Sequence, residues 1–513
     1  MQMYFAYSEI SQFSSGGLVL RVLFVNPLSN NNHEPQALPL GLLSIATAAK
    51  NNGHTVFFLD RTINSRNVKK LIQDFQPQIV GLSVISPNVL KDVKTISSYC
   101  KKQGITIVCG GLFATLGAEA ILNDSIADLI SIGEGEGTWV ELLNTMGNGG
   151  SWKEIKGIAY LENGTYKRTS DRPFLSGIEL PILDFSLVDV KKYLHPYHDC
   201  ERMTFLYSSK GCNGACTFCF NQAFHKSTHR KRPMENVLTE IRYLQEHYNV
   251  DGIYFADELW ATNKRDILEK CAAIAASGLN FVWGAQIRVG ILDRGDYEYL
   301  YRCGCRWLYF GIESGCPERL KSIKKNINLD RVLADVKSCY EIGITIWSSV
   351  IIGFPDETEE EIRQTVELCK KISKYAINQC FIFAPTLGSE IFYELKRNER
   401  IENLTTLKSL TQFIWDRVGV NYSKVPTKDL NVVSTYVLWW AFTFQTSSRG
   451  NTKHGFTLST MGNALRTIFK SGPAGAIKSA LQYAHIAIHY GRYLFFYPGV
   501  KKKYNLKIDK SKF

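Results

Sequence analysis

The 513-residue sequence has no run of about 18 uninterrupted apolar residues, which argues against a membrane-spanning helix. The best candidate, residues 432–444, is too short. No Lys or Arg precedes Arg21, so we expect no secretory signal. Low-complexity segments are missing as well, and only the last dozen residues have the composition of a disordered tail. The chain is therefore expected to fold over nearly its whole length, as two to four domains.

A disulfide framework is also missing. The 13 cysteines are odd in number and scattered, and most lie in apolar settings such as residues 106–109 and 366–369. This pattern is typical of reduced thiols in a cytosolic protein. We therefore expect a cytoplasmic location.

Acidic residues are scarce at the carboxyl end. Residues 421–513 contain 14 Lys and Arg but only Asp429 and Asp509, so the whole net charge of +12 falls there. The segment is also aromatic, with Trp439, Trp440, Phe442, Phe444 and residues 493–497. It is consistent with peripheral contact to the inner membrane face, with an acidic substrate, or with a helical cap that carries a solvated lysine tail. Nucleic acid is disfavoured because no binding motif is present.

Apolar runs and helical stretches alternate in the first part of the chain. Buried parallel strands are predicted at residues 19–25, 55–59, 79–84, 106–108 and 129–132, with helices at 40–51, 88–103 and 118–123. This order predicts a doubly wound sheet, whose ligands bind beyond the carboxyl ends of the strands. Those ends hold Asn26-Pro27, Ser83, Gly110-Gly111 and the turn from Gly133 to Gly137.

A second alternation follows a connector that contains a hairpin at residues 158–166. Strands are predicted at 203–208, 252–255, 281–286, 307–310, 345–351 and 379–383, with helices such as 234–248 and 357–374 between them. Repeated strand and helix units of this kind close into a full or partial barrel, with the chemistry on the loops after the strands. The expected segments are an α/β sheet domain at 19–148, a linker at 149–202, a partial (β/α)6 barrel at 203–394 and a mainly helical region at 395–513.

Three cysteines share the loop after the first barrel strand. Cys212, Cys216 and Cys219 are spaced by four and three residues, which places three thiolates around one compact loop. Such a loop binds three irons of a [4Fe-4S] cluster and leaves the fourth iron without a protein ligand. A structural zinc site closes with four ligands, commonly in two pairs, and no second pair follows at the usual distance.

This cysteine spacing, with Phe218 before the third cysteine, resembles the signature of radical S-adenosylmethionine (SAM) enzymes. The order of the domains resembles the cobalamin-binding subclass of that family. The resemblance implies that SAM binds the open iron and that the reduced cluster cleaves SAM to a 5′-deoxyadenosyl radical. It also implies an electron donor, either a reductase or a flavodoxin or ferredoxin.

The resemblance suggests SAM contacts on later loops. Asp257 and Glu258 follow the second barrel strand, where the family places an acidic group for the SAM amino nitrogen; a helix N-terminal carboxylate is the alternative. Gln286 and Arg288 end the third strand and are expected near the ribose or the SAM carboxylate. Glu313, in Gly311–Gly315, matches a segment near SAM, although a simple turn would use the same residues.

The first domain resembles the cobalamin-binding fold. Ser83-Val84-Ile85 and Gly110-Gly111 match two of its three signals, and the turn that holds Gly133 and Glu134 is a shared local feature. The third signal, an Asp-x-His-x-x-Gly loop, is missing after the first strand, and His33 is expected on a surface loop. Cobalamin is therefore expected without a lower histidine ligand from that loop. A bound nucleotide or a vestigial scaffold is the alternative.

These patterns together predict a cobalamin-dependent radical SAM enzyme that methylates an unactivated carbon of a small-molecule or lipid-like substrate. One alternative keeps the radical but performs cyclisation, oxidation or carbon–carbon bond formation. A second alternative, from another class, is a non-catalytic iron–sulfur sensor with a basic contact surface.

Overall fold

The computed structural model describes residues 18–29, 37–64, 66–401, 406–410, 420–445 and 497–506. The chain forms two compact units. The first is Met1–Lys192 with Asn403–Thr411, and the second is Tyr193–Glu402 with Gln412–Phe513. Three parts of the predictions lie outside the described residues: His33, residues 446–496 of the region expected to be mainly helical, and the side chains of the aromatic residues at 439–444.

The first unit contains a seven-stranded sheet in the order β2-β1-β3-β4-β5-β6-β7. The first five strands are parallel, and the hairpin β6–β7 continues the sheet in antiparallel pairing. The predicted hairpin therefore belongs to this sheet. The strands are β1 (Arg21–Asn26), β2 (Thr55–Asp60), β3 (Ile79–Ser83), β4 (Thr106–Gly110), β5 (Leu129–Ser131), β6 (Ile158–Glu162) and β7 (Thr165–Arg168).

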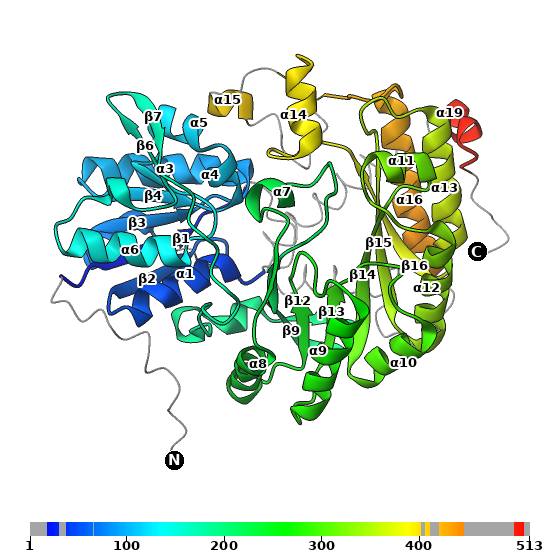
Figure 1. The fold of residues 1–513 in the computed structure, drawn as a ribbon, viewed down its shortest axis with the longest axis horizontal. Coiled ribbons are helices and arrows are strands. Elements are labelled where there is room, and N and C mark those ends of the chain that lie inside the picture. Colours follow the sequence, from blue (N-terminus) through cyan, green and yellow to red (C-terminus); the bar gives the residue numbers. More distant parts are fainter. Residues whose placement is uncertain are drawn as a thin grey trace, which may run out of the picture. The chain divides into compact units, whose positions relative to one another are not determined.

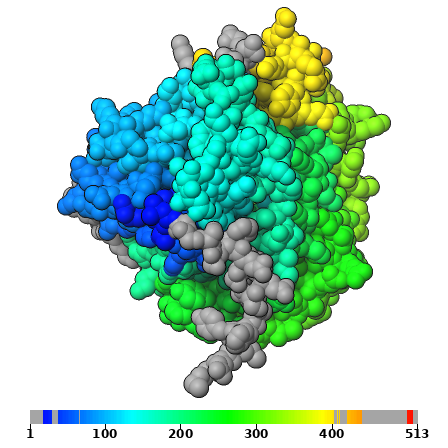
Figure 2. Space-filling model, turned by 60° about the vertical axis from the view of Figure 1, so that its left-hand side comes forward, coloured from blue at the N-terminus to red at the C-terminus, as the bar shows by residue number. Residues whose placement is uncertain are grey.

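Helices cover both faces of this sheet (Figure 1). They are α1 (Leu40–Asn51), α2 (Val68–Phe75), α3 (Leu90–Lys102), α4 (Leu112–Leu116), α5 (Ala118–Asn123) and α6 (Glu136–Gly147). Helix α1 packs against α6, and α2 packs against α3. Residues of this unit are coloured blue to cyan in Figure 2, which shows one face of the molecule. The apolar strand β1 is accordingly buried, with Leu23, Phe24 and Val25 fully inaccessible.

The strand order places a topological switch point between β1 and β3. These two neighbouring strands continue into crossovers that lead to opposite sides of the sheet, which opens a crevice beyond their carboxyl ends. The residues at this crevice are Asn26-Pro27 after β1 and Ser83-Val84-Ile85 at the end of β3. The crevice is where a sheet of this order binds its ligand.

The second unit contains a curved seven-stranded sheet in the order β16-β15-β14-β13-β12-β9-β8. All neighbours are parallel except the edge strand β8, which pairs antiparallel with β9. The two edge strands β8 and β16 do not pair, so the barrel is partial. The strands are β8 (His195–Tyr197), β9 (Cys200–Leu206), β12 (Gly252–Phe255), β13 (Val282–Gln286), β14 (Cys305–Glu313), β15 (Thr345–Ile352) and β16 (Ala376–Ile382).

A layer of helices covers the outer face of this sheet (Figure 1). Neighbours in the layer follow chain order: α8 (Met234–Tyr248), α9 (Lys264–Ala276), α10 (Arg294–Arg302), α12 (Leu329–Ile342), α13 (Glu359–Ile372) and α16 (Thr427–Gln445). Between sheet and helices, Trp260 and Trp283 pack at a ring distance of 4.7 Å and are fully buried. This core fixes the strand ends from which the functional loops depart.

The remaining elements are short. A two-stranded ribbon, β10 (Ser209–Gly211) and β11 (His229–Lys231), flanks the cysteine loop together with α7 (Asn221–Phe224). The remaining α-helices of the described residues are α11 (Pro317–Ser322), α14 (Glu390–Arg397), α15 (Leu407–Leu410) and α19 (Pro498–Lys503). The structure confirms the predicted fold class: a parallel-rich sheet, a partial barrel and a helical carboxyl-terminal region.

Candidate active site

The cysteine loop runs from β10 to α7 and is closed by Asn221, the first residue of α7. Asn221 is 2 % exposed, and its Oδ1 accepts a hydrogen bond from the backbone N–H of Cys212 at 3.0 Å. Its Nδ2 donates to the backbone carbonyl of Cys212. One amide side chain thus joins the end of the loop to its beginning, which holds the three cysteines on a fixed arc.

The three loop cysteines differ from the other ten, which are all buried. Cys212, Cys216 and Cys219 are half-buried, and none forms a disulfide. Cys212 Sγ accepts a backbone hydrogen bond from Gly214 at 3.3 Å, and Cys219 Sγ accepts one from Asn221 at 3.5 Å. Backbone donors to sulfur suit thiolates that ligate iron. Burial raises the pKa of Cys216, and it raises that of Cys219 to about 11, so these thiols need a metal's charge to ionise at neutral pH.

The donor set fits an iron–sulfur cluster better than a single metal ion. No group of three or more His, Cys, Asp or Glu side chains in the described part of the chain is arranged to hold one ion. A cluster is a larger object, and its protein ligands need only surround it. Three accessible thiols on one loop meet that requirement.

Two backbone hydrogen bonds anchor the middle of the loop to neighbouring helices. Thr217 N donates to Ile323 O just after α11 at 3.1 Å, and Ile391 N in α14 donates to Thr217 O at 3.0 Å. The ring of Phe218 packs edge-on against the buried ring of Phe354, with centroids 5.8 Å apart. Phe218 therefore positions the loop against the end of β15.

The structure separates the roles of the two neighbouring carboxylates after β12. Asp257 is 3 % exposed and accepts hydrogen bonds from Ser208 N at 3.1 Å and from the hydroxyls of Ser208 and Ser209. Burial raises its pKa to about 6, although Lys270 acts in the opposite direction. Asp257 therefore ties β12 to β9 inside the protein and has little surface left for a ligand.

Glu258 faces the cysteine loop and remains partly open. Its side chain is 37 % exposed, and its carboxylate accepts hydrogen bonds from Gly211 N at 3.0 Å and from His225 Nε2 at 3.2 Å. Burial acts to raise its pKa, but His225 and the backbone N–H of Gly211 outweigh it, and the pKa lies below its ordinary value. Glu258 is thus an ionised carboxylate that is hydrogen-bonded to Gly211, the residue before Cys212.

Gln286 and Arg288 lie at the carboxyl end of β13. The side chain of Gln286 is exposed, and Arg288 is half-buried. Within the described residues, neither side chain makes a hydrogen bond or an ion pair. A Cβ placed on Gly214 would lie 3.8 Å from Arg288 Nη2 and 3.3 Å from Cys212 Sγ. The Arg288 guanidinium therefore points at the cysteine loop with its donors available for an anion.

The segment Gly311–Gly315 ends β14 with a bulge. Glu313 adopts a left-handed backbone with φ of 69°, and its buried carboxylate pairs with Lys325 Nζ at 2.9 Å. A Cβ on Gly311 would lie 2.8 Å from that ammonium, and one on Gly315 would lie 2.7 Å from the Thr365 Cα in α13. Gly315 is therefore required by close packing against the backbone of α13, whereas the atoms close to Gly311 are the flexible ends of the ion pair.

Three residues of this site were not predicted from the sequence: Asn221, His225 and Lys325. None belongs to a recognisable motif. Lys325 is only 19 % exposed at its side chain, and it approaches Cys216 and Cys212 closely enough for its charge to act on them. A buried lysine after a short helix gives no periodic signal, so only the tertiary structure finds it.

The predicted residues of the first unit lie at the carboxyl edge of its sheet. Ser83 and Gly110 are neighbours in the β3–β4 register. Gly111 has φ of 101°, and a Cβ there would lie 3.1 Å from Val84 O. Gly133 has φ of 75°, and its backbone N–H donates a hydrogen bond to Thr115 Oγ1 at 2.9 Å. Half-buried Glu134 follows it. Glycine backbone therefore lines part of this edge, and the exposed side chain of Ile85 lies beside Gly111.

The loop after β1 is held by side chains of its neighbours. Asn26 Nδ2 donates to Asp60 Oδ1 at 3.0 Å, and Leu28 N donates to Asp92 Oδ2 at 2.8 Å. No histidine occurs in the described part of this loop, residues 26–29. The described loop thus offers no imidazole ligand to a cofactor at the crevice.

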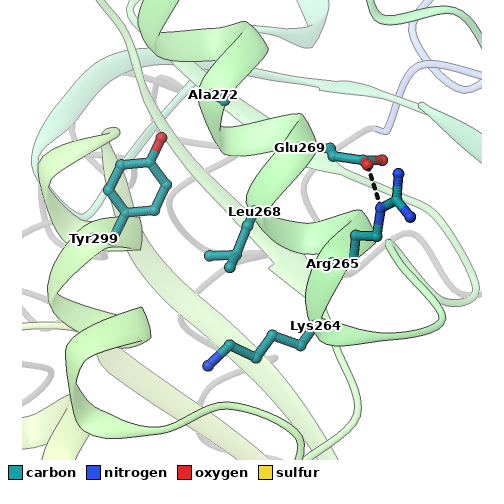
Figure 3. Close-up of a pocket in the computed structure, with 6 residues that line it drawn as sticks. All are labelled: Lys264, Arg265, Leu268, Glu269, Ala272 and Tyr299. Atoms are coloured by element: carbon teal, nitrogen blue, oxygen red, sulfur yellow. Dashed lines mark hydrogen bonds and ion pairs between the residues drawn. The ribbon is translucent and has the colours of Figure 1, made fainter.

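An open groove of about 670 Å³ lies on the helical side of the second unit (Figure 3). It is lined by α9 and α10 residues, including Leu268, Ala272 and Tyr299. Arg265 is paired with Glu269 at 2.7 Å, and Lys264 with Asp293 at 2.9 Å. Both basic side chains that line the groove are therefore paired with carboxylates, and we assign the groove no chemistry.

Two family models match the chain. The model described as the radical SAM superfamily matches residues 206–369, and the model of the B12 binding domain matches residues 31–143. The first match contains the cysteine loop and the strand ends β12 to β15. The second contains strands β2 to β5 of the first unit, with Ser83-Val84-Ile85 at the crevice.

Known proteins resemble the chain over most of its length. An uncharacterized methyltransferase of Pyrococcus horikoshii is 30 % identical over 369 residues, which is 70 % of this chain and 79 % of the relative. The anaerobic magnesium-protoporphyrin IX monomethyl ester cyclase of Rubrivivax gelatinosus is 24 % identical, covering 73 % of this chain and 70 % of the relative. The solved structure of the cobalamin-dependent SAM radical enzyme OxsB, with aqua-cobalamin and SAM bound, matches with a TM-score of 0.67 at 16 % identity, covering 93 % of this chain and 72 % of that one.

Proposed function

Since the chain belongs to the radical SAM superfamily and carries a B12-binding domain, we propose that it is a methyltransferase that methylates an unactivated carbon of a small-molecule substrate. The family assignment confirms that it is an enzyme and that its cofactors are a [4Fe-4S] cluster, SAM and cobalamin. The methyl transfer and the substrate are the proposed part.

One observation carries the SAM site: an ionised carboxylate and a guanidinium that has no hydrogen-bond or ion-pair partner among the described residues lie beside the three accessible thiols. The amino-acid end of SAM has an ammonium and a carboxylate. Glu258 is suited to the ammonium and Arg288 to the carboxylate, because charge-assisted hydrogen bonds between such partners are short and strong. Gln286, exposed at the end of β13, is suited to the ribose hydroxyls.

A reduced cluster bound by these cysteines supplies the single electron that cleaves SAM. The residues of this chain supply the rest of the site. The Asn221 clamp fixes the thiols, Phe218 packs the loop against Phe354, and Glu258 and Arg288 orient SAM. The electron must come from a donor of low potential, and we propose a flavodoxin, a ferredoxin or a dedicated reductase.

The first unit is suited to cobalamin on its own geometry. Gly111 and Gly133 hold the strand ends in left-handed conformations without side chains, which lets a large ring system approach the backbone. Ser83 and Glu134 supply polar groups at the same edge. We propose that the loop after β1 supplies no lower ligand, since its sequence lacks the Asp-x-His-x-x-Gly motif.

The decisive experiment uses SAM with a deuterated methyl group, the reconstituted holoenzyme with cobalamin, and titanium(III) citrate as reductant. We expect 5′-deoxyadenosine as a product, together with mass-labelled methyl groups on cobalamin. Absence of both products would refute the proposed function. The same reaction without cobalamin should yield no transferred label.

Cyclisation or oxidation is the second candidate, favoured by the similarity to the magnesium-protoporphyrin ester cyclase. The labelled-methyl experiment separates the two functions. Formation of 5′-deoxyadenosine with no label on cobalamin, and none in products made by a cell extract, indicates the second candidate.

We also propose a lipid-like substrate met by peripheral contact at the inner membrane face. The support comes from the sequence, because the basic and aromatic residues gather after residue 420. No helix in the described ranges is long and apolar enough to cross a membrane. Flotation with vesicles of anionic lipid should retain the full chain and lose a chain that ends at residue 420. Equal behaviour of the two chains contradicts membrane contact.

A further inference from the structure

The ion pair between Glu313 and Lys325 lies beside the cluster ligands. Lys325 Nζ donates to Glu313 Oε1 at 2.9 Å, and the two side chains are 19 % and 9 % exposed. Glu313 comes from the end of β14, whereas Lys325 follows α11. The pair is therefore built from two elements and is shielded from solvent.

The segment that carries Lys325 is held against the cysteine loop. Thr217, the residue after Cys216, donates a backbone hydrogen bond to Ile323 O at 3.1 Å, two residues before Lys325. Besides Lys325 and Glu313, Cys212 and Arg288 are the charged or titratable groups that face Cys216. Burial works against the charged form of Lys325, but Glu313 and Cys216 outweigh it and its pKa lies above the ordinary value.

Lys324, the residue before Lys325, lies in a different environment. Lys324 is exposed, and its Nζ pairs with Glu390 at 2.7 Å on α14. Two adjacent lysines thus have the same charge, but one neighbours the thiols and the other faces solvent. The second is screened by water and salt, so its influence on the thiols is weak.

We propose that Glu313 and Lys325 are a positioning pair that sets the reduction potential of the cluster bound by Cys212, Cys216 and Cys219. Reduction adds one negative charge to the cluster. A buried ammonium nearby stabilises the reduced state, and a buried carboxylate destabilises it, because charges in a low-dielectric setting interact strongly. The two residues thus act in opposite directions.

The test is a reductive titration of the reconstituted full chain without SAM, followed by electron paramagnetic resonance. For Lys325→Met, the ratio of reduced to oxidised cluster at a fixed potential should fall about tenfold, equivalent to 59 mV for a one-electron couple. For Glu313→Gln, the ratio should rise. The double variant should return towards the wild-type value, and Lys324→Met should not differ from the wild type.

Opposite shifts cannot come from general loosening of the loop, which would move both variants in the same direction. Shifts of equal sign, or no shift in either variant, overturn the proposal. If Lys325→Met does not load four irons per chain, Glu313→Gln and Lys325→Arg provide the test. The proposal is supported if the ratio of reduced to oxidised cluster rises in Glu313→Gln and keeps its wild-type value in Lys325→Arg. Any other result overturns the proposal. The titration needs only the cluster, so its outcome is independent of whether the enzyme transfers a methyl group.

Discussion

Asn221 accepts a hydrogen bond from the backbone N–H of Cys212 at 3.0 Å across nine residues of chain, and its amide nitrogen donates back to the Cys212 carbonyl. The residue that closes the cysteine loop therefore also fixes the first ligand. The geometry of the ligands then depends on a buried side chain that is not one of the three cysteines.

Replacing Asn221 with Ala should lower cluster occupancy. The substitution leaves the Cys212 N–H without its partner and costs about 1–3 kcal/mol, because an unsatisfied buried donor is expensive. Iron and sulfide per chain after reconstitution should fall below the wild-type value. The matched control is Gln245→Ala. Gln245 lies on α8, away from the loop, and its Nε2 donates a hydrogen bond to Asn280 O at 2.8 Å. Equal iron content in the two variants would contradict the role of Asn221 in holding the cysteine loop.

Replacing Glu258 with Gln should weaken SAM binding. Loss of one charge-assisted hydrogen bond, worth about 1.5–3 kcal/mol, raises the Kd by about ten- to a hundredfold. Equilibrium dialysis of labelled SAM with the cluster-loaded protein measures the change. Glu201→Gln, at an exposed position of β9, serves as the control and should bind as the wild type does. An unchanged Kd for Glu258→Gln would remove Glu258 from the SAM site.

Glu357 should destabilise the protein as the pH rises. Its carboxylate is fully buried, accepts a hydrogen bond from Phe354 N at 3.1 Å, and has Oε1 without a partner among the described residues. Burial raises its pKa from 4.5 to about 7. A folded pKa above the unfolded value means that this group's contribution to stability is present below pH 4.5 and is lost between pH 4.5 and 7. The Tm of Glu357→Gln minus the Tm of the wild type should therefore increase as the pH is raised from 5 to 8.

Glu361 provides the control with the opposite sign. Burial acts to raise its pKa, but the Thr358 N–H and the Arg319 guanidinium outweigh it and lower the pKa below 4.5. Its stabilisation is present above the unfolded pKa and is lost as the pH falls. Glu361→Gln should therefore lower Tm at pH 8 relative to the wild type. If both variants shift Tm in the same direction at pH 8, the assignment of charge states is wrong.

Replacing Gly111 with Ala should impair cobalamin retention. A Cβ at Gly111 would approach Val84 O at 3.1 Å, and φ of 101° is strained for any side chain. Gly104→Ala is the control, because φ there is 68° but nothing lies within 4 Å of the added carbon. Cobalamin absorbance that remains with the protein after gel filtration measures the effect. Equal retention in the two variants contradicts a role of the β3–β4 edge in binding.

The sequence by itself determined the fold class and the cofactors. Alternating apolar runs and helical stretches predict the parallel strands, because a strand buried on both faces needs a continuous apolar segment. The strand from Gly252 to Phe255 was predicted with its observed bounds. The spacing of Cys212, Cys216 and Cys219 predicts the cluster, because ligands on one short loop are close in space wherever the loop lies.

Only the tertiary structure decided which charges meet. Asp257 and Glu258 are adjacent in sequence and chemically alike, yet successive side chains at a strand end face opposite directions, so one is enclosed and the other faces the thiols. Glu313 at the end of β14 and Lys325 after α11 are 12 residues apart in the sequence, and the fold brings them into an ion pair. The order of strands around the β1–β3 crevice has the same origin, since hydrophobic patterns specify that a strand is buried but not which neighbour it pairs with.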